Sequence, residues 1–102
     1  MIVRHWTGLA KKDKADDYIN HLKNDTFKKL ANIEGFIEAS ILKRELHEGT
    51  EFLIITKWDS LKAIREFAGE KYEDAVVPKI AQEMMIRFDK LVKHYEVNFE
   101  TN

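Results

Sequence analysis

The stretch EFLIITKWDSLKAIREFAG, residues 51–69, reads as a strand that passes directly into a helix. Residues 52–56 are apolar, β-branched or aromatic, and this run is too short for a typical helix. Its apolar side chains fall on both faces of a strand, so both faces of the sheet require cover. The helices of the chain can cover one face, and we expect the other cover to come from another molecule.

The chain has 102 residues, enough for one hydrophobic core, so we expect a single domain over residues 1–102. Hydrophobic residues make up 44% and charged residues 34%, a balance typical of soluble folded proteins and not of disordered ones. The formal net charge is -1 with both signs interleaved, which disfavours a nucleic-acid-binding or membrane-surface protein.

The sequence contains no cysteine, which excludes disulfides, thiolate catalysis and thiolate metal sites. The four histidines are scattered without HxxxH or HxH spacing, so we expect no metal centre. No apolar run approaches the roughly 18 residues of a membrane-spanning helix, and the N-terminus lacks the pattern of a signal peptide. We therefore expect a cytoplasmic protein.

The segments of the chain follow the order βαββαβ. The expected strands are residues 2–9, 36–46, 51–58 and 88–99, and the expected helices are residues 11–31, a helix from a cap at Asp59 or Ser60 to Gly69, and residues 72–85. Imperfect alternation over residues 36–46 indicates a β-bulge, Asn24-Asp25 is expected to loosen the first helix, and Pro78 predicts a break in the last. This order predicts an α+β, ferredoxin-like fold, an antiparallel sheet with helices on a single face.

Helices on one side leave the second face of this sheet uncovered. Depending on the register, that face carries Ile2 with Trp6 or Leu53 with Ile55. Leaving several such side chains in water would cost about 1.5–3 kcal/mol each, which is large beside a net stability of about 5–15 kcal/mol. We therefore expect two copies to pair their sheets in a two-fold homodimer, and the alternative is a monomer with an apolar sheet surface.

Four segments together resemble the antibiotic biosynthesis monooxygenase superfamily. They are IVRHWTG (residues 2–8), EGF (residues 34–36), WDSLKAIREFAG (residues 58–69) and VKHYEV (residues 92–97). The resemblance covers nearly the whole chain and implies a dimeric α/β barrel built from two ferredoxin-like protomers. Some members oxidise polyketide-like aromatic compounds with O₂ and no cofactor, others degrade haem, and this chain resembles most the small members without an established substrate.

The haem-degrading relatives use an Asn on the first strand, a Trp late in the helix after the third strand and a His on the following helix. The corresponding positions here are Thr7, Phe67 and Val77. None of the three matches, and Val77 cannot ligate iron. The resemblance therefore disfavours haem degradation and implies a protein that uses no cofactor.

The candidate catalytic residues are His5 and His94. We expect His5 on the helix-facing side of the first strand, where the pockets of the family lie, and a neutral imidazole there could take a proton from a phenolic or enolic substrate. His94 would share a face with His5 if the last strand flanks the first. The alternative for each is a buried histidine bonded to a carbonyl or a neighbouring side chain.

The candidate substrate-binding residues are Thr7, Trp58, Phe67, Tyr72 and Phe88. For Trp58 the alternative is a core or interface aromatic, and for Tyr72 a half-buried surface side chain. Arg4 and Glu96 are expected to form a buried ion pair on the dimer face, because a buried charge requires a partner.

Three functions remain open. The first is a cofactor-independent monooxygenase that acts on a small hydrophobic aromatic or enolic substrate. The second is a non-catalytic, small-ligand-binding dimer that uses the same pocket, and the third is a structural dimer without a usable pocket. A cavity between the helices and the sheet would separate the third from the first two.

Overall fold

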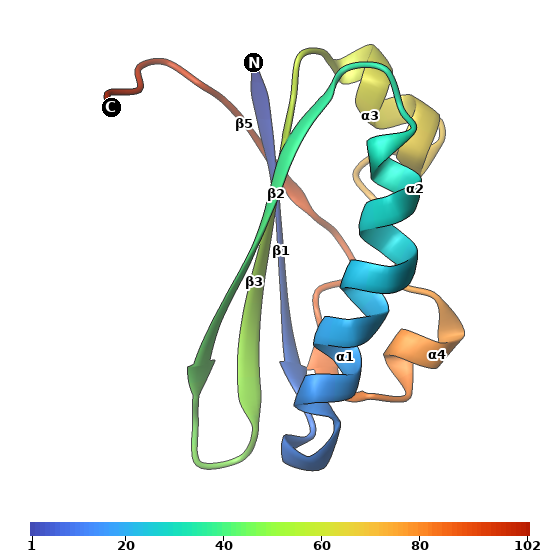
Figure 1. Ribbon diagram of the computed structural model, residues 1–102, viewed down its shortest axis with the longest axis vertical. Helices are drawn as coiled ribbons and strands as arrows, with labels where there is room; N and C mark the ends of the chain where they lie inside the picture. The colour runs from blue at the N-terminus through green and yellow to red at the C-terminus, as the bar shows by residue number, and fades with distance from the viewer.

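Strand β1 (Ile2–Ala10) lies inside an antiparallel sheet that forms one layer of the molecule, while the helices form the other (Figure 1). The computed structural model describes residues 1–102. The spatial order of the strands is β2-β3-β1-β4, and β5 also pairs with β1. The other strands are β2 (Phe36–Glu45), β3 (Thr50–Trp58), β4 (Met85–Phe88) and β5 (Lys93–Glu96). This arrangement confirms the predicted ferredoxin-like α+β fold.

The helices lie on the same side of the sheet (Figure 1). They are the 3₁₀ turn η1 (Lys12–Lys14), α1 (Ala15–His21), the π-helical turn η2 (Leu22–Thr26), α2 (Phe27–Ala31), α3 (Leu61–Ala68) and α4 (Lys79–Gln82). The π-helical turn contains Asn24 and Asp25, where the sequence predicted loosening, and both residue types have low helix propensity. No helix is both long enough and apolar enough to span a bilayer.

Local signals set the boundaries of α3 and the shape of β2 as predicted. The Ser60 side chain caps α3 by accepting a hydrogen bond from the Ala63 amide at 3.2 Å, and Gly69 ends the helix with a φ of 84°. The register of β2 against β3 shifts between Phe36 and Glu38, which confirms the β-bulge.

The predicted helix over residues 72–85 is wrong for most of its length, because only Lys79–Gln82 is helical. Pro78 stands immediately before α4 and is extended, with a φ of -59° and a ψ of 154°. Proline disfavours helical geometry in the residue before it, so the chain stays irregular up to this point and turns helical only beyond it.

The predicted single strand over residues 88–99 is instead two short strands, β4 and β5, which pair with opposite ends of β1. Between them, residues 89–92 turn toward the segment 73–75, and the Ala75 amide donates to the Lys90 carbonyl at 2.9 Å. These peptide groups therefore find their partners outside the sheet, which interrupts the fourth strand position.

Two groups of buried side chains fill the space between the sheet and the helices. The larger group contains Trp6, Tyr18 and Phe52. The smaller is built around Trp58, which is fully buried and donates its indole N–H to Thr56 Oγ1 at 2.9 Å. Both tryptophans thus contribute to the core, and the hydrogen bond satisfies the polar atom of Trp58.

No helix covers the second face of the sheet (Figure 1). Strand alternation places Val3, Leu53 and Ile55 on this open face, and Leu42 and Tyr95 beside them are 44% and 50% exposed. We call this side of the sheet the open face, and these five residues are its apolar side chains. The register thus selects Leu53 with Ile55, one of the two alternatives that the sequence left open.

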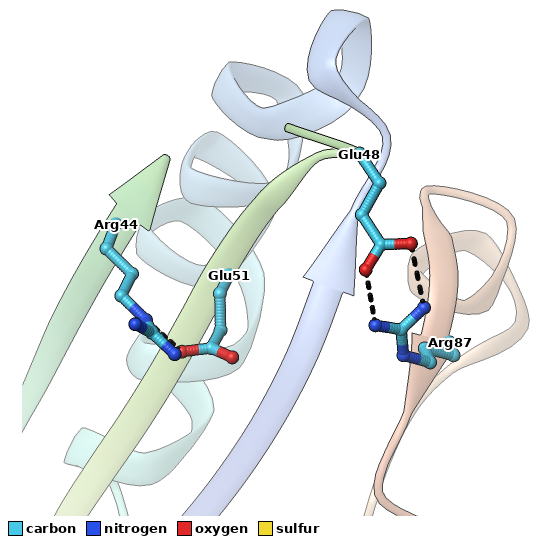
Figure 2. A network of polar contacts seen from close by, with 4 residues as sticks. All are labelled: Arg44, Glu48, Glu51 and Arg87. Atoms are coloured by element: carbon cyan, nitrogen blue, oxygen red, sulfur yellow. Dashed lines mark hydrogen bonds and ion pairs between the residues drawn. The ribbon is translucent and has the colours of Figure 1, made fainter. Parts of the chain in front are cut away.

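One end of the open face carries two ion pairs (Figure 2). Arg44 on β2 donates from Nε to Glu51 Oε1 on β3 at 2.6 Å, and Arg87 on β4 donates to both carboxylate oxygens of Glu48 at 2.6 and 3.1 Å. Glu48 lies in the turn between β2 and β3, so its pair ties this turn to β4. Solvent and salt screen such exposed pairs, and we therefore assign them a role in positioning.

We predict that Gly35→Ala destabilises the protein more than Gly69→Ala. Both glycines have a positive φ, 100° and 84°, so either alanine costs about 1–3 kcal/mol of backbone strain. At Gly35 a Cβ would also lie 2.4 Å from Asp59 Oδ1 and 2.7 Å from the Ala63 Cβ, whereas it would meet nothing within 4 Å at Gly69. Urea denaturation should show an additional loss of about 1–3 kcal/mol for Gly35→Ala, and equal losses would contradict these contacts.

Candidate functional site

A cavity of about 70 Å³ lies between the sheet and the helices. Its walls come from β1, β3, the helical stretch over residues 18–30, the end of α3 and the irregular segment before α4. Eleven of its 16 lining residues are hydrophobic, and none is acidic. The polar lining residues are Arg4, Tyr18, His21, Thr26 and Thr56. We refer to this space as the helix-side cavity.

The sequence-predicted position of His5 is wrong. Burial alternates along β1, with Arg4 and Trp6 turned toward the helices and His5 and Thr7 toward the open face. The His5 ring instead contacts the Tyr95 ring edge-on at 5.1 Å between centroids, and partial burial, followed by the charge of Lys93, lowers its pKa. Thr7, which the family resemblance had placed in the pocket, also lies outside the helix-side cavity. A catalytic role for His5 stays a prediction.

His94 lies on the helix side of the sheet, so the two histidines do not share a face. Its Nε2 lies 3.0 Å from Arg4 Nη1, and its ring contacts Tyr72 at 5.5 Å. Burial lowers the pKa of His94, and the positive charge of Arg4 lowers it further against a smaller opposing effect of Glu73. The neutral ring therefore accepts a hydrogen bond from Arg4. His94 itself is not among the residues that line the helix-side cavity.

Of the five predicted substrate-binding residues, Phe67 is the one that lines the helix-side cavity. Trp58 stacks behind it, with ring centroids 5.9 Å apart, and is part of the core. Tyr72 is half-buried and lines a surface groove with His94, while Phe88 packs against the Trp6 ring at 6.3 Å. The structure therefore does not bring these side chains together in one site.

The expected Arg4–Glu96 pair does not form, because Arg4 points into the helix side and no carboxylate lies within ion-pair distance of it. Only 5% of Arg4 is exposed. Its Nη1 donates to the Tyr72 carbonyl at 2.5 Å and its Nη2 to the Asp74 carbonyl at 3.1 Å, and the guanidinium lies 5.6 Å from the centre of the Phe67 ring. Burial lowers the pKa of Arg4 to about 10, so it remains charged at neutral pH.

Sequence reasoning missed the polar residues that the first helix contributes to the cavity. The sequence assigned neither Tyr18 nor His21 to a site, yet both line the cavity and their rings stack with centroids 6.5 Å apart. Burial raises the pKa of Tyr18. Its hydroxyl makes no hydrogen bond within the protein, and it is accessible because no fully buried polar side-chain atom lacks a partner. Their spacing of three residues, which puts both on the sheet-facing side of a helix, is the signal that could have identified them.

The cavity is small for a ligand that contains a ring. A dry cavity of about 150 Å³ accommodates benzene, roughly twice the volume present here. Val76, Val77 and Pro78 form a continuous part of the wall that belongs to no helix or strand, and the single residue Val92 is the other such part. We therefore expect ring-containing ligands to enter by displacing this segment, because its backbone is not held in a regular hydrogen-bonded element.

We predict that the His94→Gln protein loses less thermal stability at acid pH than the wild type does. The folded protein holds a proton on His94 less readily than the unfolded chain does, because the pKa of His94 is lowered from the value of about 6.5 for an unperturbed histidine. The contribution of His94 to stability is therefore present above that pH and is lost as the pH falls below it. Glutamine keeps an acceptor for Arg4 but cannot titrate, so melting curves across this range should fall less steeply.

His5 carries the same direction of pKa shift, so part of the acid sensitivity should persist in the His94→Gln protein. The matched control is His47→Gln, which changes an exposed turn residue. An unaltered pH dependence in the His94→Gln protein would contradict the neutral, hydrogen-bonded state of His94.

Several solved structures share this fold. A Bacillus cereus protein provisionally described as an antibiotic biosynthesis monooxygenase superposes with a TM-score of 0.67 at 19% identity, covering 99% of this chain and 94% of that chain. The haem-degrader MhuD from Mycobacterium tuberculosis, solved with two haems in its active site, gives a TM-score of 0.62 at 14% identity, with 100% of both chains covered. A dimeric ferredoxin-like protein from an uncultured marine organism gives 0.64 at 11% identity, covering 99% and 92%. At these identities the likeness is one of fold alone.

The sequence provides the more specific comparison. No curated protein is significantly similar to the chain. The profile of the antibiotic biosynthesis monooxygenase family matches residues 1–78, which include all the walls of the helix-side cavity except Ala81 and Val92. The chain therefore belongs to the antibiotic biosynthesis monooxygenase family.

Proposed function

We propose that the protein is a cofactor-independent monooxygenase that acts on a small hydrophobic aromatic or enolic compound in the helix-side cavity. The observation that supports this most directly is the composition of that cavity, which combines a mostly apolar wall with a histidine, a guanidinium and no acid. Apolar pockets with a few converging polar groups are the usual binding sites for small organic ligands.

The proposed reaction requires the substrate, O₂ and a base. The base removes a proton from an enolic or ring-conjugated position, and the resulting anion reduces O₂. For a ring methylene next to an enol, R₂CH₂ and O₂ give R₂C=O and H₂O through a hydroperoxide. One oxygen atom enters the product, the other leaves as water, and the substrate supplies all of the electrons, so no reducing cofactor is required.

His21 is the histidine available for this role. It is the one histidine that lines the cavity, and its Nε2 has only a long contact with Thr26 Oγ1, at 3.5 Å. An imidazole with a free nitrogen at the edge of an apolar cavity is positioned to act as a general base. The anion formed would then be held near Arg4 and Tyr18, which line the same cavity.

We do not extend haem degradation to this chain. A haem macrocycle is several times larger than a cavity of about 70 Å³, and its admission would require the first helix to move away from the sheet. Val77 also lies in the wall where the resemblance expects the iron-ligating histidine, and an isopropyl group cannot coordinate iron.

The alternative is a non-catalytic protein that binds a small ligand in the same cavity. The small volume of the cavity supports this alternative, because a compound smaller than one aromatic ring offers little conjugation to stabilise an anion. A cytoplasmic location remains a prediction from the sequence for either function.

The same proposal includes a homodimer formed through the open face. No helix covers the five apolar side chains there, of which Leu42 and Tyr95 are exposed and the other three half-buried. The C-terminal tail, which carries the 72% exposed Phe99, extends on this side of the sheet (Figure 1). Pairing two such faces would bury these groups and produce an α/β barrel, with both helix layers and both cavities on the outside. The marine ferredoxin-like neighbour, described as dimeric, is consistent with this arrangement.

We predict that the protein consumes O₂ in the presence of quinols or hydroxyaromatic enols, and that one atom of ¹⁸O₂ appears in the product. Replacing His21 with alanine should lower the rate about hundredfold or more, which is the usual contribution of a general base. The control is His47→Ala, which removes an exposed histidine of the β2–β3 turn.

Binding of these compounds without O₂ consumption would support the non-catalytic alternative. A labelled product formed at the wild-type rate by the His21→Ala protein would exclude His21 as the base.

We predict that Leu53→Lys converts the dimer into a monomer. A lysine at the centre of a paired sheet would bury a charge without a partner. In sedimentation at micromolar concentration, the wild type should behave as a dimer and the Leu53→Lys protein as a 12.0 kDa species. The matched control is Ile80→Lys on α4, a 57% exposed residue on the helix side, which should remain dimeric. A wild-type monomer would contradict the proposed pairing.

A further inference from the structure

Arg4 is a buried cation without a counter-ion. It is 5% exposed, and all ion pairs of the molecule join other residues. Its hydrogen-bond acceptors are two backbone carbonyls and the neutral ring of His94. Burying a charge is costly unless an opposite charge compensates it, so this site has an unbalanced positive charge in the absence of a ligand.

The guanidinium also retains unused donors. A guanidinium has five N–H groups, and the three hydrogen bonds of Arg4 leave the Nε–H and one N–H of Nη2 unpaired. No fully buried side-chain nitrogen of the molecule lacks a partner, so the unpaired Nε is accessible. Across the cavity, α1 contributes the Tyr18 hydroxyl, which burial keeps protonated and which has no partner in the protein. Both groups donate hydrogen bonds, and no lining residue carries a negative charge.

From this arrangement we propose that the helix-side cavity binds an apolar compound through one oxyanion, a carboxylate or an ionised phenol or enol, which the Arg4 guanidinium and the Tyr18 hydroxyl receive. The Phe67 ring, which lies against the guanidinium at 5.6 Å, holds it at the cavity wall. The proposal deepens the proposed function, since it rests on the same cavity and specifies the charge of its ligand.

A purely structural role for Arg4 does not account for these observations. Tethering the Tyr72 and Asp74 carbonyls requires donors, and a neutral amide side chain also provides two of them. The charge of Arg4 strengthens these hydrogen bonds, but it carries a desolvation penalty that the surrounding neutral acceptors do not fully offset. A ligand with a negative charge would offset it, and charge-assisted hydrogen bonds from a guanidinium to an oxyanion are among the strongest in proteins.

The first test compares benzoate with benzamide, which has nearly the same shape but no charge. Titration calorimetry should show benzoate binding the wild type at least about tenfold more tightly, as expected for a charge-assisted hydrogen bond. Arg4→Gln should abolish this preference. Arg65→Gln should keep it, because it removes the same charge from a guanidinium that lies over the Tyr72 ring, outside the cavity lining.

Tyr18→Phe provides a second, milder variant in case Arg4→Gln does not fold. It removes only the hydroxyl and should weaken benzoate several-fold while leaving benzamide unchanged. Equal affinity of the wild type for the two compounds, binding of neither, or a preference for benzoate that survives both Arg4→Gln and Tyr18→Phe would overturn the proposal.

The second test uses 4-nitrophenol, whose absorbance reports its ionisation, and distinguishes a phenolate from a carboxylate. At a pH slightly below the pKa of the free phenol, adding the wild-type protein should increase the absorbance of the phenolate, and adding Arg4→Gln protein should not. Selective benzoate binding without this change assigns the oxyanion to a carboxylate, and the change itself assigns it to the ionised ring hydroxyl. Neither measurement involves O₂, so selective binding without O₂ consumption would overturn the proposed oxygenase while retaining the anion site.

Discussion

The two-sided alternation of β1 is the constraint on which the rest of the structure depends. Consecutive side chains of a strand point to opposite faces, so Arg4 and Trp6 enter the helix side while His5 and Thr7 are held on the open face. Because β1 pairs with β3 on one side and with β4 and β5 on the other, its register also determines which apolar residues of β3 remain uncovered. A slip of one residue would exchange the contents of the two faces.

The polar groups of Arg4 and Trp6, which face the helices from β1, anchor segments of the chain that lie outside helices and strands. Arg4 donates to the Tyr72 and Asp74 carbonyls, and the Trp6 indole donates to the Asp89 carbonyl at 2.8 Å. These bonds anchor segments that lack regular pairing and position them around the cavity. The neighbouring segment before α4 has few such bonds, so we expect it to open more easily than the segments that Arg4 and Trp6 anchor.

The sequence predicts the fold better than the site. Signals that act over a few residues were sufficient for the Ser60 cap, for the glycine that ends α3 and for the π-helical turn at Asn24. The interruption of the fourth strand depends on hydrogen bonds between segments far apart in the chain, which no local pattern encodes. The orientation of His5 was missed for a related reason: alternation shows which residues share a face, but only the position of the helices shows which face they cover. Arg4 was predicted to be half of an ion pair on the dimer face and Tyr18 was not singled out, because residue type alone does not reveal a missing partner.

The central claim is that the sheet separates two roles, ligand binding on the helix side and self-association on the open face. Ile54 and Ile55 are adjacent on β3, yet Ile54 lines the cavity and Ile55 lies on the open face. Methyl NMR of these two residues tests the separation directly, during addition of benzoate and during dilution of the protein. We predict that benzoate shifts the Ile54 methyl signals and leaves those of Ile55 unchanged, and that dilution does the reverse. Benzoate-induced shifts confined to Ile55, or dilution shifts confined to Ile54, would contradict the account.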